Sequence, residues 1–373
     1  MARKQFLSFL LIFSLLFSCA SALAETDDDD DWDDNVDDAW EMEHPLHSGD
    51  YAYALLDDGT VEITSYGGAD TEIVIPDTLD GKPATAIGER AFYYSLSLTS
   101  VTIPDSVTCI SKRAFSCCYN LMSIALPSGL TAIEPGTFEL CNSLTSIAIP
   151  DSITTIAEDA FVSCKALQSF TLSPNHPYFF LADGALCRTV DNTLLFYPNA
   201  RENRTYRIPD GIAAISAYAF YDCDLLESVV IPDSITQIPE RAFYGCSALA
   251  SVSLPDSLTE IGTAAFSGCS ALTGIRIPAA ITEIINHTFS GCTSLATLEI
   301  PDSVTKIGDY AFFGCTSLTS IAIPDSVTAI GNGAFSNCTA LTLTVTPDSY
   351  AAEYAKANNI PYTYPDANDW LNN

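Results

Sequence analysis

Apolar and polar positions recur along most of this chain with a period of 23 residues. Within one block Leu318, Ile321 and Ile323 are apolar, and the residues between them are small or polar. Alternation of this kind has the period of a β-strand. The Pro-Asp-Ser that follows is typical of a turn, because proline fixes φ and aspartate bonds back to the backbone. Each block is therefore predicted to contain one short strand followed by one turn.

The second half of each block predicts a compact return of the chain. Val327 and Ile330 form another apolar pair, Gly331 permits a sharp bend, and Ala334 and Phe335 close the block. The closing residues are Phe92, Phe115, Phe138, Phe161, Phe220, Phe243, Phe266, Phe289, Phe312 and Phe335. A fixed period of this length indicates a solenoid, in which each coil buries its apolar face against its neighbours. We expect a parallel stack of about eleven strands.

Both ends of such a stack need a cap. Residues 51–75 contain two alternating apolar runs around an Asp-Asp-Gly turn at 57–59, which predicts a β-hairpin. At the other end the Pro-Asp-Ser at 347–349 precedes an alanine-rich segment, which predicts a helix. The solenoid is therefore expected over 76–346, with a helical C-terminal cap and tail over 347–373.

One block breaks the period. The prolines Pro174 and Pro209 are 35 residues apart, and no Ala-Phe-x-x-Cys lies between them. Three apolar runs are separated there by Asp183-Gly184 and by Asp191-Asn192. Turn residues between apolar runs predict antiparallel strands. We expect a hairpin insertion within the stack at 174–208.

The N-terminus has the features of an export signal. A positively charged start and a short apolar run precede the small-x-small site Ala22-Leu23-Ala24. Residues 1–24 are therefore expected to be removed, which leaves Glu25 as the first mature residue and no transmembrane segment in the mature chain. The alternative is a lipid anchor at Cys19, but Phe17 is bulky for a lipoprotein box.

The acidic composition of the chain argues against some classes of binding partner. Residues 25–50 carry thirteen acidic residues and no Lys or Arg, so we expect a disordered acidic tether there. The whole chain has a formal net charge of −32. A charge of this size and sign argues against nucleic acid and against anionic membrane surfaces as partners.

The cysteines follow the repeat. Nine of them stand three residues after a block-closing Phe, at Cys118, Cys141, Cys164, Cys223, Cys246, Cys269, Cys292, Cys315 and Cys338. Side chains in one column point the same way, whereas a disulfide needs converging Cβ atoms. We therefore expect buried free thiols in this column. The sequence leaves the state of Cys109, Cys117 and Cys187 open.

Motifs for catalysis are missing from the sequence. It has no Gly-x-Ser-x-Gly, no His-Glu-x-x-His and no Cys-x-x-Cys pair, and its four histidines have no metal-ligand spacing. The aspartates after the block prolines form a column, for which turn capping is favoured over calcium binding. We expect a non-enzymatic protein without cofactor or metal.

The block Ile-Pro-Asp-Ser-Val-Thr-x-Ile-Gly-x-x-Ala-Phe-x-x-Cys-x-x-Leu resembles the BspA-like leucine-rich repeat over residues 51–362. The resemblance implies an α/β-type repeat, that is, a leucine-rich-repeat solenoid of stacked parallel strands. It also implies a secreted or cell-surface protein that adheres to host matrix proteins or to other cells. The family has no catalytic residues to carry over.

Candidate binding residues gather around the block-closing Phe. Tyr218, Tyr221, Arg241 and Tyr244 are predicted to form one patch over two coils, because positions three apart in a helical turn share a face. Tyr310 and Phe313 are predicted to form a second patch. Tyr and Arg dominate the energetics of many interfaces, so an extracellular protein ligand or cell-surface partner is the first hypothesis. A glycan ligand and a purely structural envelope spacer are the alternatives, and coil-on-coil packing is an equally simple explanation of the patches.

Overall fold

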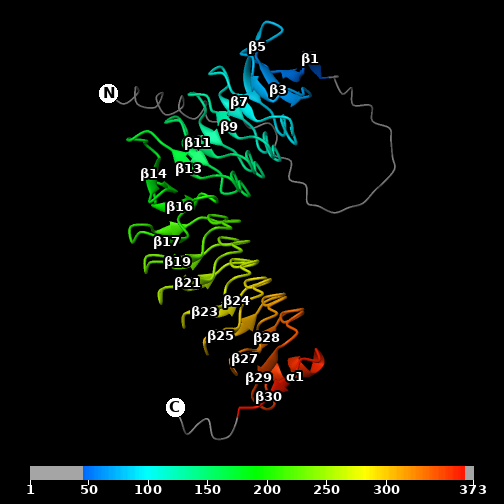
Figure 1. Cartoon of the computed structure of the whole chain (residues 1–373), viewed down its shortest axis with the longest axis vertical. Coiled ribbons are helices and arrows are strands. Elements are labelled where there is room, and N and C mark those ends of the chain that lie inside the picture. Colours follow the sequence, from blue (N-terminus) through cyan, green and yellow to red (C-terminus); the bar gives the residue numbers. More distant parts are fainter. Residues whose placement is uncertain (1–44, 366–373) are drawn as a thin grey trace, which may run out of the picture.

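A computed structural model describes residues 45–365, which form a curved stack of coils (Figure 1). Residues 1–44 and 366–373 lie outside the described residues. The expected signal segment, Cys19, the cleavage site after Ala24 and most of the acidic tether therefore lie outside them as well. Among the described residues, no helix is long and apolar enough to cross a membrane.

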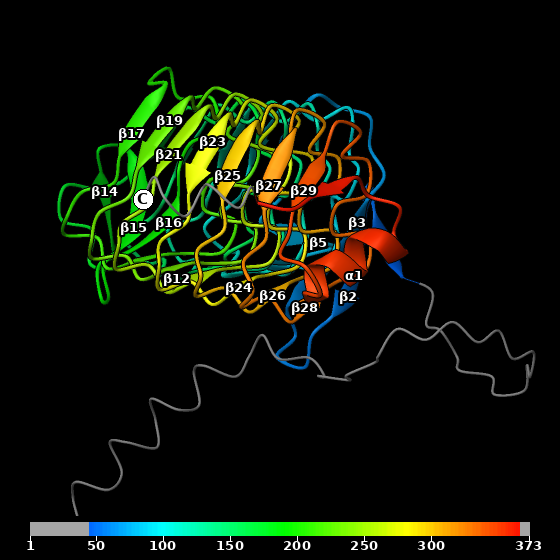
Figure 2. The ribbon, with the colours of Figure 1, turned by 90° about the horizontal axis from the view of Figure 1, so that it is seen from below.

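The first strands of the coils stack in parallel along one side of the molecule (Figure 2). They are β4 (Glu72–Val74), β7 (Ser100–Thr102), β9 (Ser123–Ala125), β11 (Ser146–Ala148), β13 (Ser169–Thr171), β17 (Thr205–Arg207), β19 (Ser228–Val230), β21 (Ser251–Ser253), β23 (Gly274–Arg276), β25 (Thr297–Glu299), β27 (Ser320–Ala322) and β29 (Thr342–Thr344). Pairing joins residues one period apart, as in Ser228 with Ser251. The middle residue of each strand points into the core and its neighbours point outward, as the alternation predicted.

A tight turn connects most of the first strands to a second strand, which is two residues long in every coil from β8 onward. Val107 N donates a hydrogen bond to Pro104 O at 3.0 Å, and the same bond recurs from Ile153 to Pro150 at 3.0 Å. The second strands are β6 (Lys82–Ile87), β8 (Cys109–Ile110), β10 (Ala132–Ile133), β12 (Thr155–Ile156), β18 (Ala214–Ile215), β20 (Gln237–Ile238), β22 (Glu260–Ile261), β24 (Glu283–Ile284), β26 (Lys306–Ile307) and β28 (Ala329–Ile330). They form the opposite side of the stack (Figure 2).

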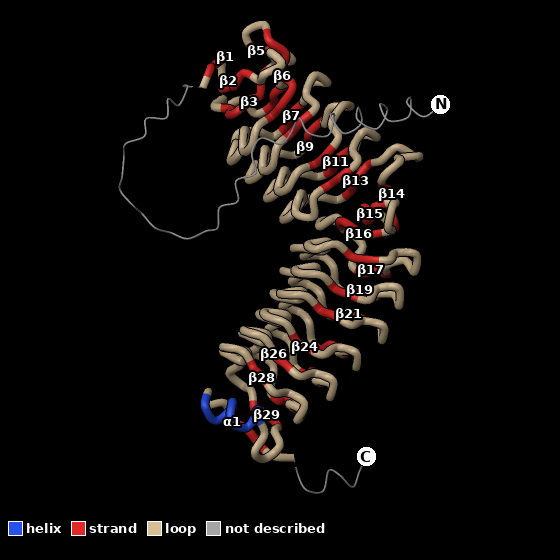
Figure 3. The backbone as a smooth tube through the Cα atoms, turned by 180° about the vertical axis from the view of Figure 1, so that it is seen from behind, coloured by secondary structure: helices blue, strands red, loops and turns tan. Residues whose placement is uncertain are grey.

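The two caps agree with the fold expected from the sequence. At the N-terminal end β2 (Tyr51–Leu55) and β3 (Val61–Tyr66) form an antiparallel hairpin, and β5 (Thr78–Leu79) pairs with β6. At the C-terminal end α1 (Tyr350–Ala357) covers the last coil and β30 (Tyr362–Thr363) pairs with β29 (Figure 3). The Ser349 hydroxyl accepts a hydrogen bond from Ala352 N at 3.2 Å and so caps the helix.

One boundary differs from the expectation. The range 25–50 was expected to be tether, but β1 (Leu46–Ser48) pairs with β2, which extends the hairpin cap to Leu46. The returning half of each coil is built of turns, as the compact return predicted, and α1 is the only helix within residues 45–365. The stacked parallel strands, the hairpin and the terminal helix are otherwise as predicted.

The insertion separates the stack into two blocks. Its strands β14 (Phe179–Ala182), β15 (Ala185–Arg188) and β16 (Thr193–Phe196) are antiparallel to one another, and β16 then pairs in parallel with β18. Both ladders are interrupted at this point, because β13 is not paired with β17 and β12 is not paired with β16. Pairing also breaks within the blocks, for example between β9 and β11 and between β21 and β23, so the insertion is one of several such breaks. We call residues 71–172 the N-terminal block and residues 205–345 the C-terminal block.

The hydrophobic core is divided at the same place. Buried residues form two clusters, and the insertion contributes to both: Leu186 and Phe196 belong to the N-terminal cluster, whereas Cys187 and Leu194 belong to the C-terminal one. The block-closing phenylalanines stack ring on ring within each block, with centroid distances of 4.9 Å for Phe92–Phe115, 5.9 Å for Phe115–Phe138, 5.5 Å for Phe138–Phe161, 4.6 Å for Phe220–Phe243, 5.3 Å for Phe243–Phe266, 5.8 Å for Phe266–Phe289, 5.6 Å for Phe289–Phe312 and 5.3 Å for Phe312–Phe335. The insertion hairpin is therefore an adaptor with one apolar face for each block.

Candidate binding surfaces

The structure brings the four residues of the first predicted patch together. The rings of Tyr221 and Tyr244 stack with centroids 4.8 Å apart and an interplanar angle of 13°. Tyr218 lies 5.8 Å from Tyr221. The Arg241 guanidinium lies 5.9 Å from the Tyr218 ring centroid, which is the geometry of a cation–π contact. We call these four residues the central patch.

Much of the central patch is satisfied by its own contacts. Arg241 Nη1 donates to the Tyr218 hydroxyl at 3.1 Å and lies 3.3 Å from a Glu240 carboxylate oxygen. All four side chains are half-buried. Burial raises the pKa of Tyr221 to about 12, so its hydroxyl stays neutral and available as a hydrogen-bond donor. The patch is a rigid, partly exposed aromatic surface.

The second predicted patch gains a residue that the sequence reasoning did not include. Tyr310 and Phe313 lie 5.9 Å apart in an edge-to-face contact. His287, one coil earlier, stacks on Tyr310 with centroids 5.2 Å apart and an angle of 13°. Tyr310 is exposed to 41%, more than the tyrosines of the central patch. The stacking of His287 could have been anticipated, because it stands 23 residues before Tyr310.

Many of these side chains stand on strained backbone. The position two residues before the block-closing Phe has positive φ in most coils: Arg90 57°, Arg113 56°, Gly136 61°, Tyr218 60°, Arg241 52°, Ala264 53°, His287 58°, Tyr310 53° and Gly333 60°. Side chains other than glycine rarely adopt this region, at a cost of about 1–2 kcal/mol per residue. Glycine fills the position in two coils, so the fold accepts it. Tyr, Arg and His occupy it in six coils and Ala264 in a further one, in spite of the strain.

A third aromatic cluster lies near the N-terminal end, and the sequence analysis did not propose it as a site. Tyr93 and Tyr94 are about half exposed, at 49% and 54%, with ring centroids 6.2 Å apart. Tyr119 meets Tyr94 edge to face at 5.9 Å. A shallow hollow beside them is lined in part by Arg90 and Arg113. The sequence indicates this hollow only through Arg90 and Arg113, which stand one period apart.

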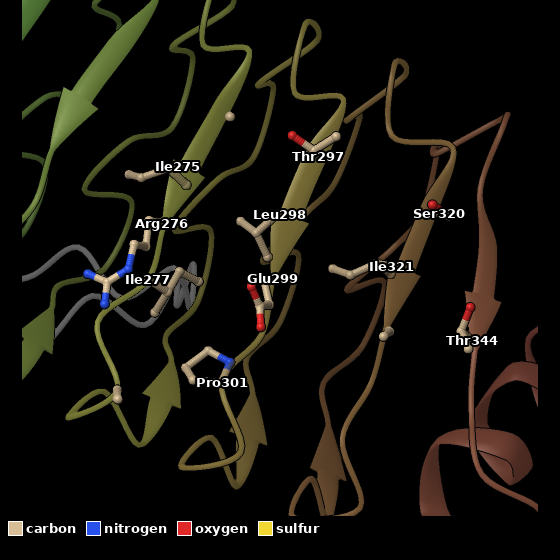
Figure 4. Close-up of a pocket in the computed structure, with 13 residues that line it drawn as sticks. Ile275, Arg276, Ile277, Thr297, Leu298, Glu299, Pro301, Ser320, Ile321 and Thr344 are labelled. Carbon is tan, nitrogen blue, oxygen red and sulfur yellow. The ribbon is translucent and has the colours of Figure 1, made fainter. Parts of the chain in front are cut away.

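The outward face of the first strands has few side chains that could select a ligand. The hollow in Figure 4 is lined by Thr297, Ser320 and Thr344, with Glu299 on the same strand as Thr297 and Arg276 on the strand before it. The Arg276 guanidinium pairs with Asp256, Nη1 to Oδ1 2.6 Å, and not with Glu299. This face therefore offers small hydroxyl and methyl groups and few charges that could select a ligand.

The column cysteines have the free-thiol state predicted for them. All nine are free, and Cys117 and Cys187 are also buried free thiols, while Cys109 is not among the free ones. Each column thiol donates to a backbone carbonyl of the preceding coil, for example Cys246 Sγ to Phe220 O at 3.0 Å and Cys292 Sγ to Phe266 O at 3.2 Å. Burial raises the pKa of the Cys164 and Cys292 thiols to about 12, so they stay protonated at neutral pH.

The aspartate column bonds mainly to neighbouring coils and not within its own turn. Asp105 Oδ1 accepts from Ser128 N at 2.9 Å and from Ser128 Oγ at 3.0 Å, 23 residues further on. Ser173 Oγ donates to Asp151 Oδ1 at 2.6 Å in the same way. The expectation that each aspartate caps its own turn was therefore wrong for these residues. Their carboxylates accept hydrogen bonds from the next coil instead. Within residues 45–365 there is no cluster of three or more metal-ligating side chains.

Comparison with known proteins agrees with the repeat. A family described as BspA type leucine rich repeat region matches residues 71–180 and 213–342 in six copies. Curated protein sequences give no match. A leucine rich cell surface protein from Faecalibacterium prausnitzii is 31% identical, with a TM-score of 0.50, over 84% of this chain and 97% of that one.

Two further solved structures share the fold at lower identity. A leucine-rich repeat protein from Eubacterium ventriosum is 24% identical, with a TM-score of 0.60, over 78% of this chain and 93% of that one. The pneumococcal vaccine antigen PcpA is 18% identical, with a TM-score of 0.61, over 87% of this chain and 99% of that one. With its 23-residue coils and a family match that spans both blocks, this chain belongs to the BspA-type leucine-rich repeat family.

Proposed function

We propose that this chain is an exported, non-catalytic module that binds an extracellular protein or cell-surface partner, and so serves adhesion. The observation that carries the proposal is the column of Tyr, Arg and His side chains on positive-φ backbone, at a position that glycine fills elsewhere. Strain that the fold does not require indicates that these side chains are kept for something other than packing. Similarity to a leucine rich cell surface protein supports a location outside the cell.

The central patch is the proposed contact surface. Tyr218, Tyr221 and Tyr244 supply large, rigid side chains that lose little conformational entropy when they bind, and Arg241 is already held in place by Tyr218 and Glu240. The insertion at 174–208 lies next to this patch in the stack, because Tyr197 stacks on Phe220 at 5.3 Å. Tyr310 and Phe313 extend the surface two coils beyond Phe266.

A glycan partner is less well supported at the central patch. Sugar platforms need exposed ring faces, and the faces of Tyr221 and Tyr244 are turned to one another at an angle of 13°. A structural spacer would need no aromatic side chains on strained backbone. A nucleic-acid partner is disfavoured by the net charge of −32.

The proposal is tested with a triple variant in a pull-down against extracellular matrix proteins, with a glycan array in parallel. Tyr218→Ser, Tyr221→Ser and Tyr244→Ser together are expected to abolish capture while circular dichroism stays that of the parent. Removing three exposed tyrosines outside the patch, Tyr178, Tyr350 and Tyr362, is the matched control and should leave capture unchanged. Equal capture by a folded triple variant and by the parent would place the contact surface elsewhere.

A further inference from the structure

A second surface, in the N-terminal block, has a composition unlike that of the central patch. Arg90, Tyr93, Arg113, Cys117 and Glu139 line one shallow hollow. We call it the N-terminal hollow, with Tyr94 and Tyr119 as its rim, because their rings continue from Tyr93. The central patch is a packed aromatic stack, whereas this hollow is open and mixes hydrogen-bond donors with one carboxylate.

Two arginines from adjacent coils are the centre of the hollow. Arg90 and Arg113 occupy the same position in successive coils, where parallel backbones lie about 4.8 Å apart. Within residues 45–365 no carboxylate lies within ion-pair distance of the Arg90 guanidinium. Arg113 has a loose partner, with Nε 3.7 Å from Glu139 Oε2. Both guanidinium groups are exposed and retain hydrogen-bonding capacity for a ligand.

The next coil leaves room for Arg113. A Cβ atom at Gly136 would lie 2.9 Å from Arg113 Cγ and 3.4 Å from its Nε, so the arginine side chain lies directly over the glycine backbone. Gly136 thus provides the space that holds Arg113 over the hollow. Arg113 itself keeps a φ of 56°, although glycine in the same column shows that the fold does not need a side chain there.

Polar groups surround the arginines at fixed positions. Ser116 Oγ donates to Glu139 Oε2 at 3.4 Å, which orients the carboxylate, and Ser116 is buried. The Cys117 thiol lies beside them in the lining, with Sγ 3.7 Å from Ser116 Oγ. The hollow therefore presents two cations, one anion, hydroxyl groups and two half-exposed tyrosine rings.

The charges select among anionic ligands. The net charge of the lining is +1, from two arginines and one glutamate, within a chain of net charge −32. A dense polyanion would be repelled by Glu139 and by the field of the whole protein. A single carboxylate attached to a ring of neutral hydroxyls fits better, because Arg binds the carboxylate through paired donors, Glu139 accepts from hydroxyls and Tyr packs against the ring.

We infer that the N-terminal hollow binds a saccharide that carries an isolated carboxylate, such as a hexuronic acid next to a neutral sugar. Arg90 and Arg113 hold the carboxylate, Glu139 and the tyrosine hydroxyls hold the sugar hydroxyls, and the Tyr93 ring packs against the pyranose. An acidic peptide is disfavoured, because the lining offers Leu140 as its one apolar side chain for peptide residues to bury against. This site is separate from the central patch, so either can fail without the other.

The test measures binding of a hexuronic acid–hexose disaccharide to the full chain by calorimetry, with saturation-transfer NMR as a second readout. We expect a Kd on the order of 1 mM, because a shallow wet site competes with water for each hydrogen bond. Arg90→Gln and Arg113→Gln should each weaken binding by about tenfold or more. Arg113→Lys should weaken it less than Arg113→Gln does, because the charge remains and the paired geometry is lost.

The controls distinguish loss of the two arginines in the hollow from loss of positive charge anywhere on the protein. Arg207→Gln and Arg276→Gln remove the same charge elsewhere and should leave the disaccharide affinity unchanged. The methyl ester of the disaccharide, which lacks the negative charge, should not bind measurably. Equal binding of the ester, equal binding by Arg90→Gln and Arg113→Gln variants, no binding of the disaccharide at about ten times the expected Kd, or tighter binding of a triglutamate peptide would each overturn the inference.

Discussion

The N-terminal and C-terminal blocks have the same coil but place different residues at one position where the backbone has positive φ. The second residue after the block-closing Phe has positive φ in both blocks. In the C-terminal block it is glycine in the four inner coils, at Gly245, Gly268, Gly291 and Gly314, with Asp222 and Asn337 in the two end coils, and in the N-terminal block it is Tyr94, Cys117, Leu140 and Ser163. Glycine adopts this conformation without steric cost. The four inner coils of the C-terminal block are thus relaxed at this edge, while every coil of the N-terminal block keeps a side chain there under strain.

The choice of residue at this position matches the neighbours that it contacts in each block. In the C-terminal block the glycines approach one another closely, and a Cβ at Gly268 would lie 3.3 Å from Gly245 Cα. In the N-terminal block the same column supplies Tyr94 and Cys117, which belong to the rim and lining of the N-terminal hollow. One block uses this edge for regular stacking and the other uses it to present side chains. Predictions that treat the blocks separately therefore test whether the contrast is real.

The largest expected effect is loss of stability in alkali. Burial raises the pKa of thiols in both blocks, including Cys118 and Cys164 in the N-terminal block and Cys292 in the C-terminal one, each to about 12. Unfolded thiols lose their proton above about pH 8.5, whereas folded ones retain it, so stability falls as pH rises through the window from about 9 to 12. Each such thiol contributes up to about 1.4 kcal/mol of loss per pH unit.

Denaturant unfolding at pH 7 and at pH 10.5 measures this loss. The pKa is raised in four column cysteines of the C-terminal block, Cys223, Cys269, Cys292 and Cys315, and in three of the N-terminal block, Cys118, Cys141 and Cys164. We expect hydrogen exchange to report earlier alkaline opening in the C-terminal block. A free energy of unfolding that is unchanged at pH 10.5 would contradict the assignment of buried, protonated thiols.

The next effect in size is removal of one core phenylalanine from either block. Phe243 is fully buried between Phe220 and Phe266, so Phe243→Ala should cost about 3–5 kcal/mol. Because the two ladders and the core are interrupted at the insertion, the damage should stay in the C-terminal block, and limited proteolysis should cut near residues 232–255. Phe138→Ala is the matched variant and should open the N-terminal block instead. Simultaneous loss of both blocks in either variant would show that the insertion couples them tightly.

The smallest expected effect is that of exchanging glycine and a larger residue at the second position after the block-closing Phe. Gly291→Ala places a Cβ at a φ of 72° and should cost about 1–2 kcal/mol. Leu140→Gly makes the reverse change at a φ of 61° in the N-terminal block. There the relief of strain offsets the lost burial of a half-exposed leucine, so stability should change by less than about 1 kcal/mol. Thermal melting of the two variants side by side measures the asymmetry, and equal destabilisation would remove the contrast between the blocks.

The repeat made the architecture predictable. The alternation around Ile321 and the Pro-Asp-Ser turn depend on local chemistry, and the Phe and Cys columns depend on the period, so both are visible in one sequence. The insertion was visible as a break in the period. Its role in the core was not: Tyr197 takes the place of the missing Phe, since Tyr197 N donates to Ala219 O at 2.8 Å and Cys223 Sγ contacts Tyr197 O at 3.7 Å. No motif marks a tyrosine that replaces a phenylalanine in this way.

The candidate surfaces were predictable only in part. The period placed Tyr221 over Tyr244, because equal positions in adjacent coils must face one another. The positive φ of Arg113 and Tyr218 was hidden, since side chains other than glycine give no sequence signal for that conformation. Tyr119 could not be joined to Tyr94, because the two stand at different positions in their blocks and meet only through the curvature of the turns.

The 23-residue register also bears on how such a chain changes length in evolution. Backbone bonds between coils join residues one period apart, as in Thr305 N to Thr282 O at 2.8 Å. Deleting residues 268–290 would join Ser267 to Gly291 and set Gly291 against Gly245, where another glycine stood before. Loss or gain of one whole coil is therefore nearly silent for the contacts that remain, whereas loss of a single residue shifts every outward side chain inward. The reach of the binding surface can lengthen or shorten in whole coils while its chemistry at either end is preserved.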